Sequence, residues 1–281
     1  MKFLFSFLCI IFALTGCTSY YTKVKKAEIF ASHRGFKKEL VKGKGFWITT
    51  YQKIKDPNQP FVFYIEGDGV TSKKMSSGYR KPTQNPTPFN LITLNLAHLD
   101  NRESVPNVVY LAQPCQYTPF NVNTLCGKEY WTRKKMAPEV VESLNKVINF
   151  IAGNNPVHLV GYSGGGGLAI LIAANNPNVG SIITVAGMLD RSQFNKYHRL
   201  ISDADYSLDP LKYAKSVSKI SQIHLSGTKD EIIPPFIASA FVKESNASKV
   251  QQKIILGAKH DSDKWKEIWH DFISQLPLAF N

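Results

Sequence analysis

The sequence predicts an α/β fold in which helices cover both faces of a mostly parallel central sheet. Short, wholly apolar runs such as Phe61–Ile65 (FVFYI) are typical of strands that are buried on both faces. Segments with a helical spacing of apolar residues, such as Pro138–Ile151, lie between these runs. The chain has 281 residues, 43% of them hydrophobic, which is enough for one sizeable core.

The elements can be assigned in order along the chain. The expected strands are Gly45–Tyr51, Phe61–Ile65, Val108–Ala112, Val157–Val160, Ser181–Ala186, Ile223–Ser226 and Lys253–Leu256. The expected helices are Pro138–Ile151, Leu168–Ala174, Pro235–Val242 and Trp265–Leu276. Pro138 suits a first helical turn, because the proline there loses no helical hydrogen bond. Strands that alternate with helices imply right-handed crossovers, and ligands bind at the carboxyl ends of such strands.

Residues 1–16 have the pattern of a removable signal peptide. A positive start at Lys2 precedes an apolar run over residues 3–14, which is too short to span a bilayer as a helix. The following residues 14–17 (LTGC) resemble the lipobox of bacterial lipoproteins, which would make Cys17 the lipidated residue. An ordinary signal peptide cut near the same place is the alternative. We expect an exported protein, lipid-anchored in the bacterial cell envelope at the outer membrane or the periplasmic face.

The remainder of the chain divides into a tether and one domain. Residues 17–44 are polar and rich in lysine, which favours a tether between the anchor and the fold. Residues 45–281 contain every expected strand and helix, and no internal repeat or low-complexity tract interrupts them. The membrane, reached through the lipid anchor, is therefore one expected partner.

The cysteines agree with export. With Cys9 in the leader and Cys17 lipidated, Cys115 and Cys126 remain in a compartment where disulfides persist. A bridge between them would close a loop of about a dozen residues and stabilise the fold by about 3 kcal/mol in the chain-entropy model. Two unpaired thiols are the alternative.

The net charge of +13 does not indicate nucleic-acid binding. The basic residues are scattered, no DNA- or RNA-binding motif is present, and export removes the usual partner. Lys23, Lys25 and Lys26 follow the expected anchor and could lie against anionic headgroups, each contributing about 1 kcal/mol. A solvated linker is the alternative.

Residues 161–165 (GYSGG) match the pattern G-x-S-x-G between an apolar strand and a helix. The pattern demands a sharp turn, because side chains at Gly161 and Gly165 would collide with the neighbouring strand and helix. Such a turn exposes the Ser163 hydroxyl at the amino end of a helix, as a nucleophile requires. A phosphate-binding loop is a poorer interpretation, since no lysine follows the glycines in the required register.

A serine hydroxyl needs a base, and the base needs an acid to orient it. His260 follows the last expected strand, where a general base would lie at the sheet's carboxyl edge. Asp230 follows the strand Ile223–Ser226 and is the expected acid, with Glu231 as its nearest competitor. The order serine, aspartate, histidine is that of the α/β-hydrolases.

An oxyanion hole would complete the site. Gly164 supplies one backbone N–H directly after the candidate nucleophile, and residues 66–69 (EGDG) should supply the second, from Asp68. From about residue 45 to residue 276 the chain resembles the α/β-hydrolase superfamily. It departs from many members by having Glu66-Gly67 where they have His-Gly.

Two further stretches resemble exported bacterial α/β-hydrolases of uncharacterised activity. They are residues 114–117 (PCQY) and 130–132 (YWT), which flank the expected disulfide. Phe120 lies between them and could line an acyl pocket or belong to a simple loop core. The segment from Gly187 to Ser221, where superfamily members often carry a cap, is long enough only for a small lid.

These features together predict a serine hydrolase that cleaves carboxylic ester or related acyl bonds through an acyl-enzyme, acting on a small acyl or ester substrate. No cofactor is expected, and no metal-ligand motif is present. A peptidase or an acyltransferase could use the same three residues. A catalytically silent lipoprotein that uses the fold for binding is the rival from another class. Labelling with a fluorophosphonate probe separates that rival from an enzyme.

Overall fold

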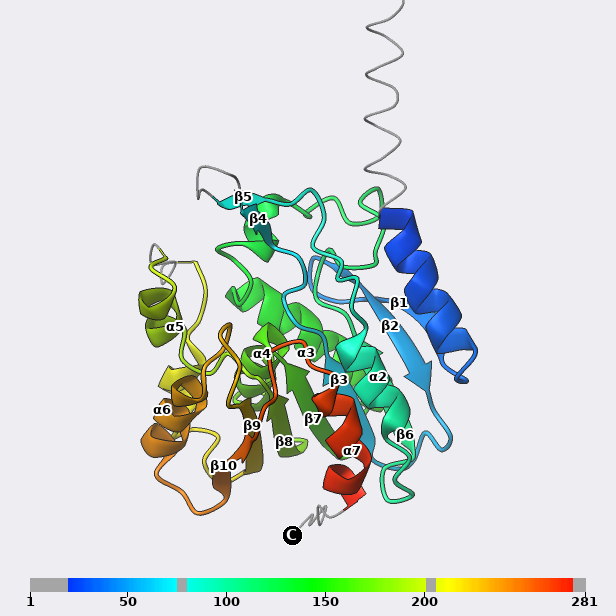
Figure 1. Cartoon of the computed structure of the whole chain (residues 1–281). Helices are drawn as coiled ribbons and strands as arrows, with labels where there is room; N and C mark the ends of the chain where they lie inside the picture. The colour runs from blue at the N-terminus through cyan, green and yellow to red at the C-terminus, as the bar shows by residue number, and fades with distance from the viewer. Residues whose placement is uncertain (1–19, 75–79, 201–205, 275–281) are drawn as a thin grey trace, which may run out of the picture.

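The computed structural model describes residues 20–74, 80–200 and 206–274 (Figure 1). The strands of its main sheet are β1 (Lys37–Lys42), β2 (Trp47–Lys53), β3 (Phe61–Ile65), β6 (Asn107–Leu111), β7 (Val157–Tyr162), β8 (Val179–Val185), β9 (Ser221–Gly227) and β10 (Val250–Ile255). A separate antiparallel pair is formed by β4 (Ser72–Lys74) and β5 (Arg80–Pro82).

Helices connect most of these strands. They are α2 (Ile92–Leu99), α3 (Pro138–Ala152), α4 (Gly164–Ala173), α5 (Arg191–Tyr197), α6 (Pro235–Ser245) and α7 (Lys264–Ser274), with short 3₁₀ helices η1 (Lys128–Trp131) and η2 (Pro210–Tyr213). A further helix over residues 20–32 precedes β1 and is the blue helix of Figure 1.

The strands lie in the order β1-β2-β6-β3-β7-β8-β9-β10. β2 pairs antiparallel with both β1 and β6, and every other pair of neighbours is parallel. The predicted fold class, a mostly parallel sheet between helices, is therefore confirmed. Because the parallel strands all point the same way, the loops that follow them gather at one edge of the sheet.

The core consists of two apolar clusters, one on each face of the sheet. Successive side chains along a strand point to opposite faces, so β3 places Phe61 and Phe63 in one cluster and Val62 and Tyr64 in the other. The first cluster is completed by α3, α4 and α6, and the second by α2, α7 and the helix over residues 20–32. Figure 1 shows this layering, with α2 and α7 in front of the central strands.

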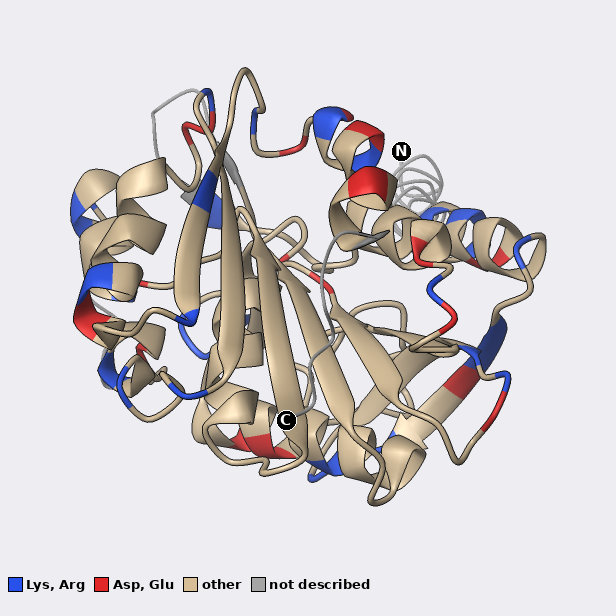
Figure 2. Cartoon of the chain, turned by 90° about the horizontal axis from the view of Figure 1, so that it is seen from below, with Lys and Arg blue, Asp and Glu red and all other residues tan. Residues whose placement is uncertain are grey.

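Burial on both faces explains why the central strands were the clearest signal in the sequence. Every residue of β3, β6 and β7 is buried. Figure 2 shows the strands at the centre of the sheet in tan, with the charged positions on helices, loops and outer strands. The central strands therefore read as continuous apolar runs.

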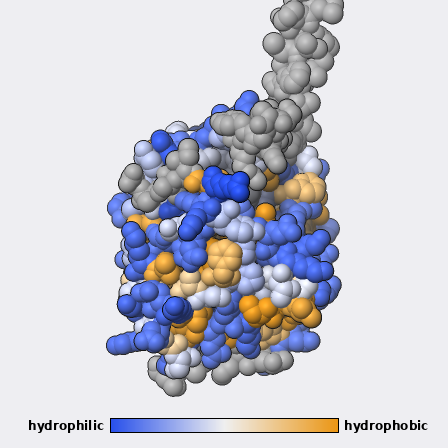
Figure 3. Space-filling view, turned by 60° about the vertical axis from the view of Figure 1, so that its left-hand side comes forward, coloured by the Kyte–Doolittle hydropathy of each residue, from blue (hydrophilic) through white to orange (hydrophobic). Residues whose placement is uncertain are grey.

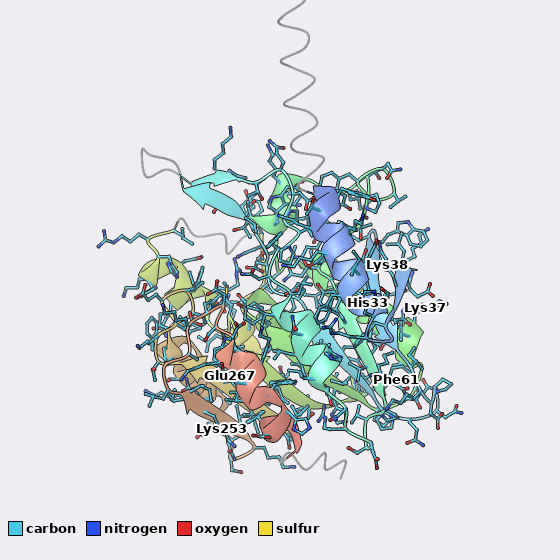
Figure 4. All side chains as sticks on the ribbon, turned by 45° about the vertical axis from the view of Figure 1, so that its right-hand side comes forward. His33, Lys37, Lys38, Phe61, Lys253 and Glu267 are labelled. Carbon is cyan, nitrogen blue, oxygen red and sulfur yellow. A yellow bond between two sulfur atoms is a disulfide. The ribbon has the colours of Figure 1, made fainter. Side chains whose placement is uncertain are left out.

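The structure differs from the tether expected over residues 17–44, because the chain is folded from residue 20 onward. Ala27 and Ala31 of the first helix are 0% and 1% exposed, and β1 pairs with β2 along its whole length. Lys38 of β1 forms an ion pair with Glu28 of that helix. Figure 4 shows Lys37 and Lys38 on this outer strand. The expected signal peptide and Cys17 lie outside the described residues.

β1 was not predicted as a strand because its sequence (KKELVK) is rich in lysine. β1 is one of the two edge strands of the sheet, and only Val41 among its six residues is buried. Lysine on an edge strand discourages pairing with other chains, so the composition that suggested a linker is also typical of a protected edge.

Two buried histidines predict a loss of stability in mild acid. His158 on β7 and His224 on β9 are 3% and 0% exposed. Burial lowers the pKa of His158 to about 4 and that of His224 to about 3. The unfolded chain, with histidine pKa values of about 6.5, therefore binds protons that the folded chain does not, and stability falls as the pH drops below about 6.5.

We expect the free energy of unfolding to fall by about 2 kcal/mol per buried histidine between pH 7 and pH 5. Burial raises the pKa of the Glu66 carboxyl, which acts in the opposite direction and offsets part of this fall. Urea midpoints at the two pH values measure the change. His224→Asn should reduce the pH dependence, whereas His33→Asn, at an exposed position, should not. An equal pH dependence in both variants would contradict the assignment.

Candidate active site

Ser163 lies in the sharp turn between β7 and α4. Its φ of 53° and ψ of −122° are a backbone conformation that residues other than glycine rarely adopt. A methyl group on Gly161 would lie 2.2 Å from the Gly165 carbonyl oxygen, and one on Gly165 would lie 2.3 Å from the Ile65 carbonyl oxygen. The two glycines therefore allow the turn that presents the Ser163 hydroxyl at the amino end of α4.

A continuous chain of hydrogen bonds joins the three residues expected to form a catalytic triad. His260 Nε2 lies 3.0 Å from Ser163 Oγ, and His260 Nδ1 lies 2.9 Å from Asp230 Oδ2. The Asp230 side chain is fully buried, whereas that of His260 is 16% exposed. With Nδ1–H donating to the carboxylate, Nε2 is left as the acceptor that faces the hydroxyl.

The structure distinguishes Asp230 from its neighbour Glu231. Asp230 Oδ1 accepts hydrogen bonds from the backbone N–H groups of Ile232 and Ile233, at 2.9 and 2.8 Å. This fixes the carboxylate so that Oδ2 faces His260. Glu231 is exposed and is not the partner of the imidazole.

Two side chains that sequence reasoning missed hold the His260 backbone in place. The Tyr162 hydroxyl donates to the His260 carbonyl oxygen at 3.0 Å, and Trp265 Nε1 donates to the same oxygen at 2.9 Å. Burial raises the pKa of Tyr162 well above its usual value, so its hydroxyl stays a donor. Tyr162 occupies one of the two variable positions of the G-x-S-x-G pattern, so the pattern carries no information about this contact.

Residues 66–69 lie directly against the turn at Ser163. A methyl group on Gly67 would be 3.1 Å from Ser163 Cβ, and one on Gly164 would be 1.9 Å from Asp68 Oδ1. Neither the Gly164 N–H nor the Asp68 N–H donates a hydrogen bond to another described residue. The two residues expected to supply the oxyanion hole therefore lie in contact, and the N–H of each is not used within the described structure.

The Glu66 side chain fixes residues 66–69 through three hydrogen bonds. Its carboxylate accepts hydrogen bonds from the Thr93 hydroxyl at 2.6 Å, the Tyr110 hydroxyl at 2.8 Å and the Gly67 N–H at 2.8 Å. Burial raises the pKa of Glu66 above its usual value, although these hydrogen bonds act in the opposite direction. The departure from His-Gly therefore replaces an imidazole with a buried, fully engaged carboxyl group.

The stretch around residues 114–117 supports the same loop from the side. Gln113 Nε2 donates to the Glu66 carbonyl oxygen at 2.9 Å, and Gln116 Nε2 donates to the Gly67 carbonyl oxygen at 2.8 Å. Cys115 lies between the two glutamines and is joined to Cys126 by a disulfide. Residues 114–117 thus contact residues 66–69 through Gln116.

A cavity of about 590 Å³ opens beside Ser163 and His260. Its wall includes apolar side chains from three segments: Phe89 and Ile92; Met188, Phe194 and Leu200; and Ile232 and Ile233. The segment expected to form a small lid therefore contributes to the wall through α5 and its flanking residues. On the side of α5 and α6, apolar side chains lie interspersed with hydrophilic ones (Figure 3).

Phe120 does not line this cavity. Its ring stacks on Trp131 of η1 with 6.2 Å between the centroids, and the residue is 42% exposed. Of the two interpretations of Phe120, the structure favours packing within the loop.

Neither a metal-binding cluster nor a membrane-spanning helix is found among the described residues. No cluster of three or more His, Cys, Asp or Glu side chains there is placed to hold a metal ion. Within the same ranges, no helix has both the length and the apolar character needed to cross a bilayer.

No family model and no curated protein sequence matches this chain, but solved structures resemble it. Est1E from Butyrivibrio proteoclasticus has a TM-score of 0.59 at 11% identity, over 85% of this chain and 98% of Est1E. An alpha-beta serine hydrolase homologue from Coxiella burnetii has a TM-score of 0.55 at 15% identity, over 84% and 97% of the two chains. The esterase Pf2001 from Pyrococcus furiosus has a TM-score of 0.57 at 12% identity, over 87% and 92%. By its sheet order, the turn after β7 and these structural neighbours, the chain has the α/β-hydrolase fold.

Proposed function

We propose that this protein is a serine hydrolase that cleaves carboxylic ester or related acyl bonds through an acyl-enzyme. The observation that carries the proposal is the hydrogen-bonded chain from Asp230 through His260 to Ser163, whose Ser163 end lies in a cavity at the carboxyl edge of the sheet. Structural neighbours described as esterases agree with this class of chemistry.

Acylation uses each element of the site. Ser163 Oγ attacks the carbonyl carbon of the substrate while His260 Nε2 takes the hydroxyl proton. Asp230 stabilises the imidazolium that forms, and the Gly164 and Asp68 N–H groups stabilise the oxyanion. His260 then returns its proton to the leaving alcohol as the tetrahedral intermediate collapses.

Deacylation repeats the same steps with water as the nucleophile. His260 removes a proton from the attacking water, and the oxyanion forms again between the two amides. As the intermediate collapses, His260 returns the proton to Ser163 Oγ, which releases the carboxylic acid and restores the free hydroxyl. The apolar side chains of the cavity wall, among them Ile92, Met188 and Ile233, give the acyl or alcohol portion of the substrate a place to bind.

A fluorophosphonate probe and a series of p-nitrophenyl esters test the proposal. The probe should label the protein covalently at Ser163, as mapped by mass spectrometry of the labelled peptide. Ester turnover from two to twelve acyl carbons should show an optimum, because a cavity of this volume accommodates a limited chain. A protein that neither reacts with the probe nor hydrolyses any of these esters would be a binding protein of the same fold.

We further propose that the protein is exported and lipid-anchored through Cys17. The motif at residues 14–17 supports the proposal because it resembles the lipobox of exported lipoproteins. The disulfide between Cys115 and Cys126 also supports it, since disulfides persist in an oxidising compartment outside the cytoplasm. In a bacterial host, the protein should sediment with membranes, and Cys17→Ser should move it to the soluble exported fraction. Ala substitution of Cys115 should leave the membrane fraction unchanged. An unmodified N-terminus at another residue, found by mass spectrometry, would exclude lipidation.

A further inference from the structure

The Asp68 side chain, as well as its backbone N–H, lies at the candidate oxyanion hole and is paired with a lysine. Its carboxylate forms an ion pair with Lys135, with 2.6 Å between Asp68 Oδ2 and Lys135 Nζ. The two side chains are only 10% and 14% exposed. Gln113 Nε2 adds a longer hydrogen bond to Asp68 Oδ1, at 3.3 Å. Lys135 comes from the segment between η1 and α3, 67 residues further along the chain.

This carboxylate lies beside the candidate oxyanion hole. A methyl group on Gly164 would be 1.9 Å from Asp68 Oδ1, so the Asp68 side chain packs on the residue whose N–H would bind the oxyanion. Negative charge at this place opposes the negative charge that develops on the substrate oxygen. In a partly buried site such repulsion is several times stronger than in water.

The charges around the hole make Lys135 the compensating group. Residues 66–69 contain two acids, Glu66 and Asp68, and Glu66 is engaged by hydroxyl and amide donors only. Among the described residues that line the cavity, Lys135 is the one lysine or arginine. Asp68 forms no other ion pair with the described residues.

Resting on the proposed function, we propose that Lys135 is a positioning residue of the oxyanion hole. Its ammonium holds the Asp68 side chain against Gly164 and cancels the charge that this carboxylate would otherwise place beside the oxyanion. Lys135 thus gives a role to the residues that follow 130–132, as Gln116 does to residues 114–117.

The proposal predicts an effect on the transition state and a specific rescue. Lys135→Met leaves the Asp68 charge uncompensated, so kcat should fall about tenfold or more on p-nitrophenyl butyrate, with KM changed less than about threefold. The rate of fluorophosphonate labelling should fall in parallel, because that adduct also places an oxygen in the hole. Asp68→Asn removes the offending charge, and the double variant Asp68→Asn/Lys135→Met should recover to within about threefold of Asp68→Asn alone.

Two further variants separate this role from a general loss of structure. Lys134→Met makes the same change at the neighbouring residue, which pairs with Glu139 and does not line the cavity, and should behave as wild type. Lys135→Arg keeps the charge and should retain most of kcat. Thermal unfolding of each variant identifies any that fails to fold. If Lys135→Met is one of these, the comparison of the double variant with Asp68→Asn still tests whether the effect of Lys135 depends on the Asp68 charge.

The possible results differ in what they overturn. If the wild type is labelled at Ser163 but Lys135→Met retains its kcat, the inference about Lys135 fails and the proposed function stands. A double variant no faster than Lys135→Met would also overturn it, since the loss would not depend on the Asp68 charge. An increase in KM alone would instead make Lys135 a contact for the substrate. A wild type with neither labelling nor turnover overturns the proposed function and this inference together.

Discussion

Replacing Ser163 with alanine is expected to abolish fluorophosphonate labelling and to lower ester turnover by about 10⁴-fold or more. The reason is that Ser163 Oγ is the only atom of the chain that His260 Nε2 contacts by a hydrogen bond in the described structure, and without it no acyl-enzyme forms. Residual turnover would come from the oxyanion hole and from substrate binding alone.

The fold should survive this change. Alanine at position 163 meets the same backbone strain at a φ of 53° as serine does, and the turn depends on Gly161 and Gly165 rather than on the hydroxyl. Thermal unfolding should therefore stay close to that of the wild type. Ser239→Ala, at an exposed position on α6, is a matched control that should leave labelling intact. Unchanged labelling of Ser163→Ala would exclude Ser163 as the nucleophile.

The central fold could be predicted because its signals are local. β3 and β7 are buried along their whole length, so their apolar runs stand out without knowledge of any partner. The turn at Ser163 requires glycine two positions before and two positions after it, so five consecutive residues are enough to identify its geometry. Asp230 and His260 could be placed because each follows a strand that ends at the same edge of the sheet.

The parts that sequence reasoning missed depend on contacts distant along the chain. The helix over residues 20–32 packs through Ala27 and Ala31, small residues that do not form a strong apolar stripe. Nothing near Lys135 in the sequence indicates that it meets Asp68. The glutamines that hold residues 66–69 lie more than forty positions away from them. Recognising these contacts requires the sheet order, which places the loops after β3 and β6 side by side.

The second large effect is expected at the two partners of Ser163. His260→Ala removes the general base and should lower turnover nearly as much as Ser163→Ala, because the three residues act as a unit. Asp230→Asn should cost less, by about 10²- to 10⁴-fold. Its Oδ1 can still accept from the Ile232 and Ile233 N–H groups, so the side chain should keep its place. The amide nitrogen would then face His260 Nδ1 as a donor and favour the tautomer that carries its proton on Nε2, which cannot accept from serine.

Glu231→Gln is the matched control for this series, since it makes the same isosteric change at the adjacent acid. Glu231 is exposed and lies outside the hydrogen-bonded chain, so turnover should change less than about twofold. The measurement is kcat/KM on one p-nitrophenyl ester for all three variants, with unfolding temperatures to show that each is folded. Severe loss in Glu231→Gln with a mild effect of Asp230→Asn would reassign the acid while keeping the Ser163–His260 pair. Persistent activity in His260→Ala would remove the general base from the mechanism, because no other described side chain accepts the proton of Ser163.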